Sequence, residues 1–132
     1  MELLLVLPVL LLAGPDSLFG GDGDDLLVMF DGDTGTGGAG ADRFFTENYD
    51  NRDDGGLPLR WSDEPVVVID FTPGTDQIEI QVFGRPADNT PELLAVTGGT
   101  MIRFGEDDVM FLPAIAPGAI LNTDIIINLN RP

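Results

Sequence analysis

The sequence contains no histidine and no cysteine. Their absence removes imidazole bases, thiolate nucleophiles and disulfides, together with the nitrogen and sulfur ligands that zinc sites usually require. Any metal must therefore be bound through oxygen, and oxygen-only sites select hard ions such as Ca²⁺, Mg²⁺ or Mn²⁺. Flexible loops that mix carbonyls with carboxylates favour Ca²⁺ among these ions.

Lysine is also absent, and 6 basic residues, all arginine, stand against 23 acidic ones, for a formal net charge of -17. Self-repulsion of this size opposes compaction unless counter-ions bind, and it excludes electrostatic attraction to nucleic acid or anionic lipid. Because 43% of the 132 residues are hydrophobic, the chain has enough apolar surface for one folded domain. Cations are its natural partners.

Long apolar runs are missing as well. Leu3–Ala13 is apolar but is interrupted by Pro8 and is shorter than the ~20 residues that span a bilayer, so no membrane span is predicted. Two interpretations of this start stay open. It is a cleaved signal peptide, although its start is not basic, or residues 1–12 form a strand or helix that covers the first coil of the domain.

A nine-residue repeat occupies the N-terminal third. Gly20–Val28 (GGDGDDLLV) and Gly37–Phe45 (GGAGADRFF) both match the pattern GGxGxDxUx, in which U is a large apolar residue. Leu11–Phe19 (LLAGPDSLF) keeps the fourth, sixth and eighth positions of this pattern. Met29–Thr36 (MFDGDTGT) is one residue short, with Thr34 and Thr36 in place of the aspartate and the apolar residue, so it is degenerate and its calcium binding is left open.

The residue types of the repeat have a physical reason. Six residues form a turn that needs positive φ at its glycines, and three form a short strand that points one apolar side chain inward. The inward candidates are Leu18, Leu27 and Phe44. Stacked turns bring carbonyls and carboxylates of adjacent coils together around calcium. The sixth-position aspartates are therefore the expected carboxylate ligands: Asp16, Asp25 and Asp42.

These repeats resemble the RTX, or haemolysin-type calcium-binding, family over residues 13–45. The resemblance implies a short parallel β-roll in which carbonyls at positions one, three and five complete each site. Carried onto this chain, it adds Gly20, Asp22 and Asp24 beside Asp25 in one coil, and Gly37, Ala39 and Ala41 beside Asp42 in the next. Family rolls are usually longer, so about one to three calcium ions are expected.

Two alternatives for the glycine and aspartate residues are weaker. A flexible acidic linker would explain the composition but not the fixed spacing or the apolar eighth position. An EF-hand on Asp22, Asp24 and Asp33 is rejected, because Leu27 replaces the glycine at loop position six and Asp33 replaces the final glutamate.

The second half predicts further strands. Residues 46–65 are polar and rich in turn formers, which predicts a long excursion that contains Trp61. Short β-type runs follow at Val66–Phe71, Gln77–Phe83, Leu93–Thr97, Thr100–Phe104, Val109–Leu112 and Ile125–Leu129. They predict a β-sandwich-like cap over residues 66–132. Carboxylates in its turns are expected to be solvated rather than to bind metal: Asp70, Asp76, Asp107 and Asp108.

The fold expected is therefore all-β, with one domain composed of a segment at 1–12, a calcium-binding roll at 13–45, the excursion at 46–65 and the cap at 66–132. VVVIDFTPGTDQIEI and MIRFGEDDVMFL are similar to the segment that follows the repeats in RTX proteins, which implies type I secretion from a bacterium.

The function expected is that of a secreted, extracellular or cell-surface protein that folds on, or is stabilised by, Ca²⁺. A structural or adhesive protein, in which calcium only rigidifies the scaffold and a protein or glycan binds the excursion, remains an alternative. A hydrolase with paired carboxylates is disfavoured because no acid pair stands apart, so the chain is not expected to be an enzyme.

Overall fold

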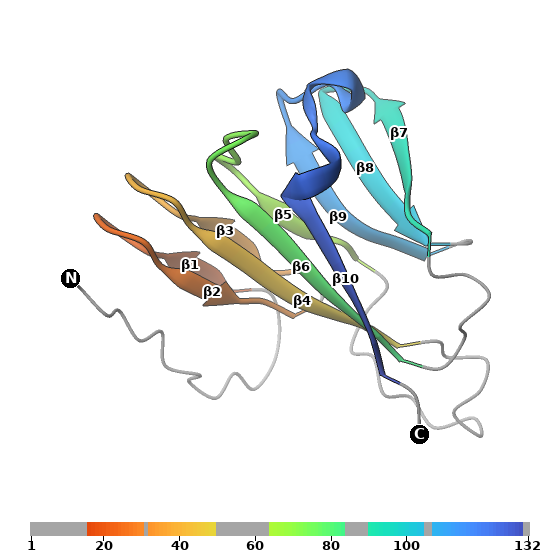
Figure 1. The fold of residues 1–132 in the computed structure, drawn as a ribbon, viewed down its shortest axis with the longest axis horizontal. Helices are drawn as coiled ribbons and strands as arrows, with labels where there is room; N and C mark the ends of the chain where they lie inside the picture. The colour runs from red at the N-terminus through yellow and green to blue at the C-terminus, as the bar shows by residue number, and fades with distance from the viewer. Residues whose placement is uncertain (1–15, 31, 50–63, 84–89, 105–106, 131–132) are drawn as a thin grey trace.

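The computed structural model describes residues 16–30, 32–49, 64–83, 90–104 and 107–130 (Figure 1). The predicted segment 1–12 and Trp61 lie outside these ranges. Within them, the regular structure consists of β-strands and two short 3-10 helices. The expected all-β class is confirmed.

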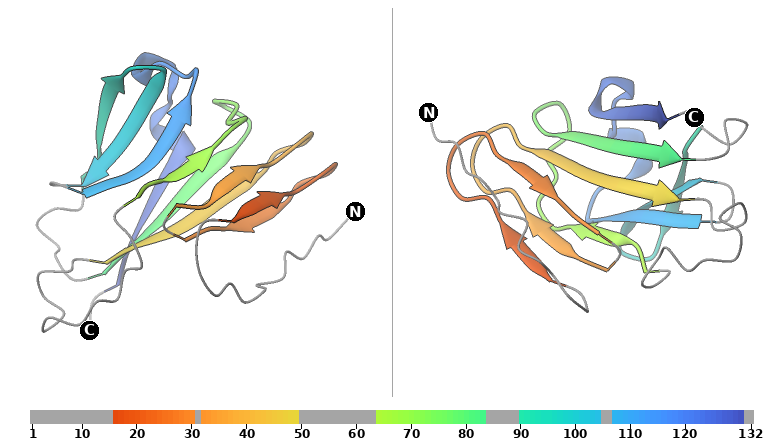
Figure 2. Two further views of the ribbon diagram at one scale, coloured as in Figure 1. Left: turned by 180° about the vertical axis from the view of Figure 1, so that it is seen from behind. Right: turned by 90° about the horizontal axis from the view of Figure 1, so that it is seen from below.

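The first six strands alternate between two sheets. β1 (Ser17–Phe19), β3 (Thr34–Thr36) and β5 (Val66–Val68) pair in parallel in one sheet. β2 (Leu26–Val28), β4 (Arg43–Tyr49) and β6 (Gln77–Phe83) pair in parallel in the other. Each coil of the chain thus adds one strand to each sheet, and Figures 1 and 2 show the coils stacked side by side. This is the predicted parallel β-roll.

The C-terminal strands continue both sheets. β9 (Asp107–Pro113) pairs in parallel with β5, and β10 (Ile125–Asn130) pairs in parallel with β6, so together they make a further coil. β7 (Glu92–Val96) and β8 (Gly99–Phe104) form an antiparallel hairpin beside β9. The sheets run β1-β3-β5-β9-β8-β7 and β10-β6-β4-β2. The roll therefore extends beyond the residues that carry the complete nonapeptide pattern.

Turns of 3-10 helix connect the last two strands. η3 (Pro117–Ala119) and η4 (Asn122–Asp124) lie between β9 and β10. No helix in the described ranges has the length and apolar character needed to cross a membrane.

Strand positions follow the repeat closely. β1 and β2 are the last three residues of their nine-residue units, as predicted, and β4 starts at the equivalent residue, Arg43. β4 then continues to Tyr49, four residues into the predicted excursion. Thr46 explains part of this extension, because its buried hydroxyl donates a hydrogen bond of 2.9 Å to the carbonyl of Met29 in the preceding coil. The excursion therefore begins later than the sequence suggested.

The core lies between the two sheets. Leu27, Phe44 and Ile78 stack in register along β2, β4 and β6 with no exposed surface. Ile80 and Val82 continue the same face of β6, because alternate residues of a strand point to the same side of the sheet. Burial of such side chains contributes about 1.5–3 kcal/mol each relative to exposure.

The six-stranded sheet, on the other side of the core, explains why the repeat at Met29–Thr36 is degenerate. Leu18, Gly35 and Val68 are register partners across β1, β3 and β5, so Gly35 occupies the inward eighth position of its unit. A Cβ on Gly35 would lie 2.6 Å from Sδ of Met29, which is fully buried. Met29 thus fills the space that an apolar eighth-position side chain occupies in the other coils.

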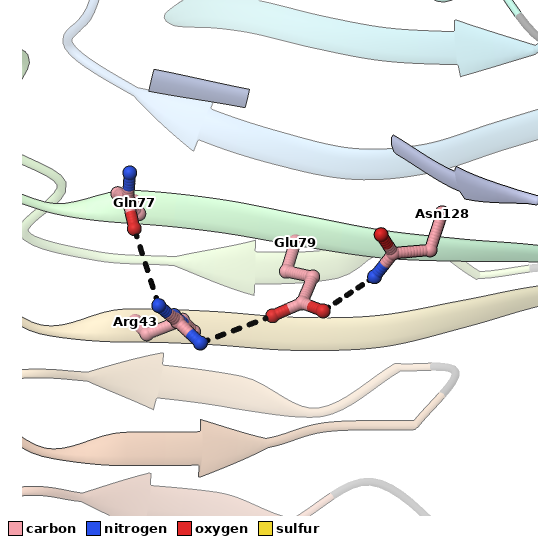
Figure 3. Close-up of polar contacts among 4 residues, drawn as sticks. All are labelled: Arg43, Gln77, Glu79 and Asn128. Carbon is pink, nitrogen blue, oxygen red and sulfur yellow. Dashed lines mark hydrogen bonds and ion pairs between the residues drawn. The ribbon is translucent and has the colours of Figure 1, made fainter. Parts of the chain in front are cut away.

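A polar row crosses the outer face of the β4-β6-β10 sheet (Figure 3). The Arg43 guanidinium contacts the Glu79 carboxylate at 3.4 Å and donates a 3.4 Å hydrogen bond to the Gln77 side chain. Asn128 donates to the other oxygen of Glu79. Because Arg43 is half exposed, the ion pair contributes only about 0–1 kcal/mol to the stability of the fold. Its main effect is to make this face of the sheet hydrophilic.

Candidate cation site in the glycine loops

The turns of the roll form two rows, here called its two edges: the turns of one edge lead into the four-stranded sheet, and those of the other lead into the six-stranded sheet. The turns Gly20–Asp25 and Gly37–Asp42 lead into β2 and β4 of the four-stranded sheet, and the turn that ends at Asp76 leads into β6. Asp16 and Asp33 instead precede β1 and β3 of the other sheet. The predicted ligands are therefore divided: Asp25 and Asp42 belong to one edge, and Asp16 belongs to the other.

Aspartates at equivalent positions form a ladder along each edge. Oδ1 of Asp42 accepts the backbone N–H of Asp25 at 2.9 Å, and Oδ1 of Asp76 accepts that of Asp42 at 2.9 Å. At the other edge, Oδ1 of Asp33 accepts the backbone N–H of Asp16 at 2.9 Å. One carboxylate oxygen in each pair is thus used to join neighbouring coils.

The second carboxylate oxygen separates these aspartates into two kinds. In Asp33 it accepts the N–H of Phe30 at 2.9 Å, and in Asp76 it accepts the N–H of Thr72 at 2.9 Å. Asp124, before β10, accepts the N–H of Leu121 at 2.8 Å in the same way. Both oxygens of each of these carboxylates therefore already accept a backbone N–H group, so none of them is left without a partner.

Asp42 differs from them. Its Oδ2 is buried and accepts no hydrogen bond from the residues that the structure describes. A Cβ added to Gly37 would lie 2.3 Å from this atom, so the glycine loop leaves room for the carboxylate without donating to it. A buried carboxylate oxygen without a partner costs free energy that a cation ligand recovers. Oδ2 of Asp16 is also buried without a hydrogen bond there, but Asp16 is the first described residue.

The two glycine loops approach one another closely. A Cβ on Gly38 would lie 2.3 Å from the carbonyl oxygen of Gly21, and one on Gly40 would lie 2.4 Å from that of Gly23. Gly38 has φ 89° and Gly40 has φ 109°, conformations that glycine adopts at no steric cost. The glycines therefore let carbonyl oxygens of the first loop lie against the second.

Asp25 lies at the centre of this interface. Its side chain is buried, and a Cβ on Gly20 would meet Oδ2 of Asp25 at 2.6 Å and the carbonyl oxygen of Gly37 at 2.7 Å. A carboxylate oxygen of the first loop and a carbonyl oxygen of the second thus lie on the same side of Gly20. Oxygen atoms so arranged are the donors that calcium prefers.

The electrostatics of the loops favour a positive ion. Burial raises the pKa of Asp42 above its ordinary value; the N–H of Asp25 opposes this shift, while the carboxylates of Asp76, Asp25 and Asp70 add to it. Each of these causes except the hydrogen bond makes the ionised form costly. A bound cation removes that cost.

The remaining predicted ligands are more exposed. Asp22, Asp24, Ala39 and Ala41 lie on the surface of the loops, and Oδ1 of Asp24 accepts the N–H of Ala41 at 2.8 Å. The Asp24 side chain therefore joins the loops, and the carbonyls of these four residues stay predicted ligands. The carbonyls seen at the interface, those of Gly21, Gly23 and Gly37, include two at positions that the resemblance did not suggest.

Two aspartates of the ladder, Asp33 and Asp76, were not among the ligands predicted from the sequence. Asp33, and not Thr34, fills the sixth-position role in the short repeat, because Gly35 is the register partner of Leu18. Aligning this repeat with the others with a one-residue gap before Asp33 would have placed Asp33 at the sixth position. Asp76 was expected to be solvated but is buried. FTPGTDQIE, with Gly74, Asp76 and Ile78 at the fourth, sixth and eighth positions, is the signal that identifies it as another copy.

The oxygen atoms at this site fit a calcium ion that is bound mainly by backbone carbonyls. In the part of the chain that the structure describes, no three His, Cys, Asp or Glu side chains group into a metal site. Carbonyls would therefore provide most ligands, with Asp25 and Asp42 as the carboxylates. A polar cavity of about 260 Å³ lies at the same edge, beside Asp42, Asp76 and Asp124.

Comparison with known proteins adds little to this geometry. No family model matches the sequence, and no curated protein matches it. Among solved structures, the AlgE6R3 subunit from the Azotobacter vinelandii mannuronan C5-epimerase is similar, with 20% sequence identity, 90% of this chain and 81% of that chain covered, and a TM-score of 0.38. The fold assignment therefore rests on the strand pairings described above.

Proposed function

We propose that this chain is a calcium-binding protein whose β-roll is stabilised by Ca²⁺ held between the loops Gly20–Asp25 and Gly37–Asp42. The observation that carries the proposal is Oδ2 of Asp42, a buried carboxylate oxygen without a hydrogen bond from the described residues. In the equivalent Asp33, Asp76 and Asp124, both carboxylate oxygens accept backbone N–H groups. Asp42 differs from these three aspartates in that it ends a complete GGxGxD sequence.

Calcium is favoured over magnesium by the kind of ligand available. Carbonyl oxygens on irregular loops, with one or two carboxylates, suit the larger and more flexible coordination of Ca²⁺. Mg²⁺ requires near-octahedral geometry and retains several waters, which the close approach of the two loops does not favour.

The proposed setting is extracellular. A net charge of -17 opposes folding where divalent cations are scarce, and extracellular calcium modules bind with dissociation constants of about 10⁻⁴ to 10⁻³ M. Secretion by a type I system, membership of the RTX family and a non-enzymatic role belong to this same proposal. The adhesive alternative shares the calcium site and differs only in a partner on the predicted excursion at residues 46–65.

Calorimetric titration tests the proposal. Protein stripped with a chelator is titrated with CaCl₂ and, in parallel, with MgCl₂, together with the Asp42→Asn variant. Glu92→Gln is the matched control, because it removes the same charge from the exposed end of β7. We expect Ca²⁺ to bind the wild-type and control proteins with similar affinity and to bind Asp42→Asn at least ten-fold more weakly. Absence of heat and of any calcium retention in the wild-type protein would reject the proposal.

A further inference from the structure

Asp70 binds the second glycine loop from the next coil. Its two carboxylate oxygens accept the backbone N–H groups of Gly37 and Gly38, each at 2.9 Å. Asp70 follows β5 and lies outside every copy of the nine-residue pattern. Consecutive N–H groups of this kind form a concave anion site, and here the anion is a side chain of the protein.

These hydrogen bonds also determine where the carbonyls of the loop point. In a planar trans peptide, the N–H and the C=O of the same unit point in opposite directions. The unit that joins Thr36 to Gly37 shows this, because its N–H meets Asp70 while its carbonyl accepts the N–H of Gly20 at 2.9 Å in the first coil. Asp70 and the first coil thus hold this peptide from opposite sides.

The next peptide unit carries a candidate ligand. Because the N–H of Gly38 meets Asp70, the carbonyl of Gly37 points away from Asp70 and toward the first loop. There its oxygen lies 2.7 Å from the ideal Cβ position of Gly20, which is also 2.6 Å from Oδ2 of Asp25. Two oxygens with negative charge density therefore lie close to the same point, the ideal Cβ position of Gly20.

We propose that Asp70 is a positioning residue for the calcium site: it binds no calcium itself and aims the carbonyl of Gly37 toward the carboxylate of Asp25. The inference rests on the proposed function. Without the two hydrogen bonds, the glycine-rich loop would have to order this peptide at the moment of binding. Groups that orient the direct ligands of a metal typically affect its affinity by about 10- to 100-fold.

The test compares wild-type protein with Asp70→Asn, which keeps the size of the side chain but loses one acceptor and the charge. Calcium affinity is measured by calorimetry at about 0.15 M and about 1 M NaCl, where the screening length falls from about 8 to about 3 Å. Glu92→Gln is again the control for net charge. Hydrogen exchange of the Gly37 and Gly38 amides is followed by NMR in calcium-free wild-type protein and in the variant.

We expect protected Gly37 and Gly38 amides in the wild type, faster exchange in the variant, and calcium affinity reduced about ten-fold or more at both salt concentrations. Equal calcium affinity of variant and wild type, or a loss that disappears at high salt, would overturn the inference while leaving the proposed function intact. Fast exchange of both amides in the wild type would also overturn it, whether or not the variant folds. A wild-type protein that binds no calcium would overturn the proposed function itself.

Discussion

Asp42 accepts the backbone N–H of Asp25 through Oδ1 at 2.9 Å and keeps Oδ2 buried beside Gly37 without a hydrogen bond from the described residues. One oxygen therefore joins two coils, and the other is available for a cation. In Asp76, one coil further, both oxygens accept N–H groups, from Asp42 and Thr72. In the proposed site, the same residue type at the same place in the coil would thus bind calcium in one turn and support only the fold in the next.

Substitution at Asp76 should destabilise the protein whether or not calcium is present. Asp76→Asn leaves one oxygen for two N–H donors, those of the buried Asp42 and of Thr72, so the free energy of unfolding should fall by about 1–3 kcal/mol. Denaturant unfolding in calcium-free and in calcium-containing buffer measures this. The calcium-dependent part of the stability should be unchanged, and its loss would show that Asp76 serves the cation.

Alanine substitutions in the glycine loops should distinguish two costs: the strain of a positive φ and the steric clash of a new Cβ with the neighbouring loop. Gly21 and Gly38 have nearly the same φ, 90° and 89°, but a Cβ on Gly21 meets nothing within 4 Å whereas one on Gly38 meets the Gly21 carbonyl at 2.3 Å. Gly38→Ala should therefore cost about 1–3 kcal/mol more than Gly21→Ala. Thermal unfolding of both variants provides the comparison, and equal losses would contradict the close packing of the loops.

Met29 and Gly35 should be energetically coupled. Met29→Ala should lower the free energy of unfolding by about 2–5 kcal/mol, because it leaves a cavity beside Gly35. Gly35→Ala should be harmful alone, since its Cβ would lie 2.6 Å from Sδ of Met29, and better tolerated when Met29 is alanine. Additive losses in the double-mutant cycle would contradict the account of the short repeat.

Much of the fold follows from periodicity that the sequence displays. The strands at Ser17–Phe19 and Leu26–Val28, and the inward faces of Leu27, Phe44 and Ile78, were predictable because the nine-residue unit specifies both the turn and the strand. The pairing of β9 and β10 as a further coil was not, because strands separated by a hairpin carry no repeat that signals their partners.

The site was predictable in part. The sixth-position rule identified Asp25 and Asp42, but it could not show that Asp16 belongs to the other edge. Nor could it show that Asp70 contacts Gly37, since that contact joins residues 33 positions apart through side-chain geometry. Whether a carboxylate is saturated by its own turn depends on local backbone direction, which motif spacing does not specify.

The raised pKa of Asp42 predicts a pH dependence in calcium-free protein. A group whose folded pKa exceeds its unfolded value, here about 3.8, contributes stability at low pH that is lost as pH rises through the folded pKa. Wild-type protein should therefore gain stability relative to Asp42→Asn as pH falls from about 7 toward about 4. Denaturant unfolding across this range tests it, and parallel curves for the two proteins would be the contrary result.

The most direct test of the calcium site is the dependence of unfolding free energy on calcium concentration in wild-type and Asp42→Asn proteins. Binding to the folded state alone adds RT ln(1 + [L]/Kd), about 2.7 kcal/mol per ion at a hundred-fold excess. We expect the unfolding free energy of the wild type to rise steadily with the logarithm of calcium concentration, with no comparable gain in magnesium and a nearly flat line for Asp42→Asn. A flat wild-type line, or equal slopes in both proteins, would contradict it.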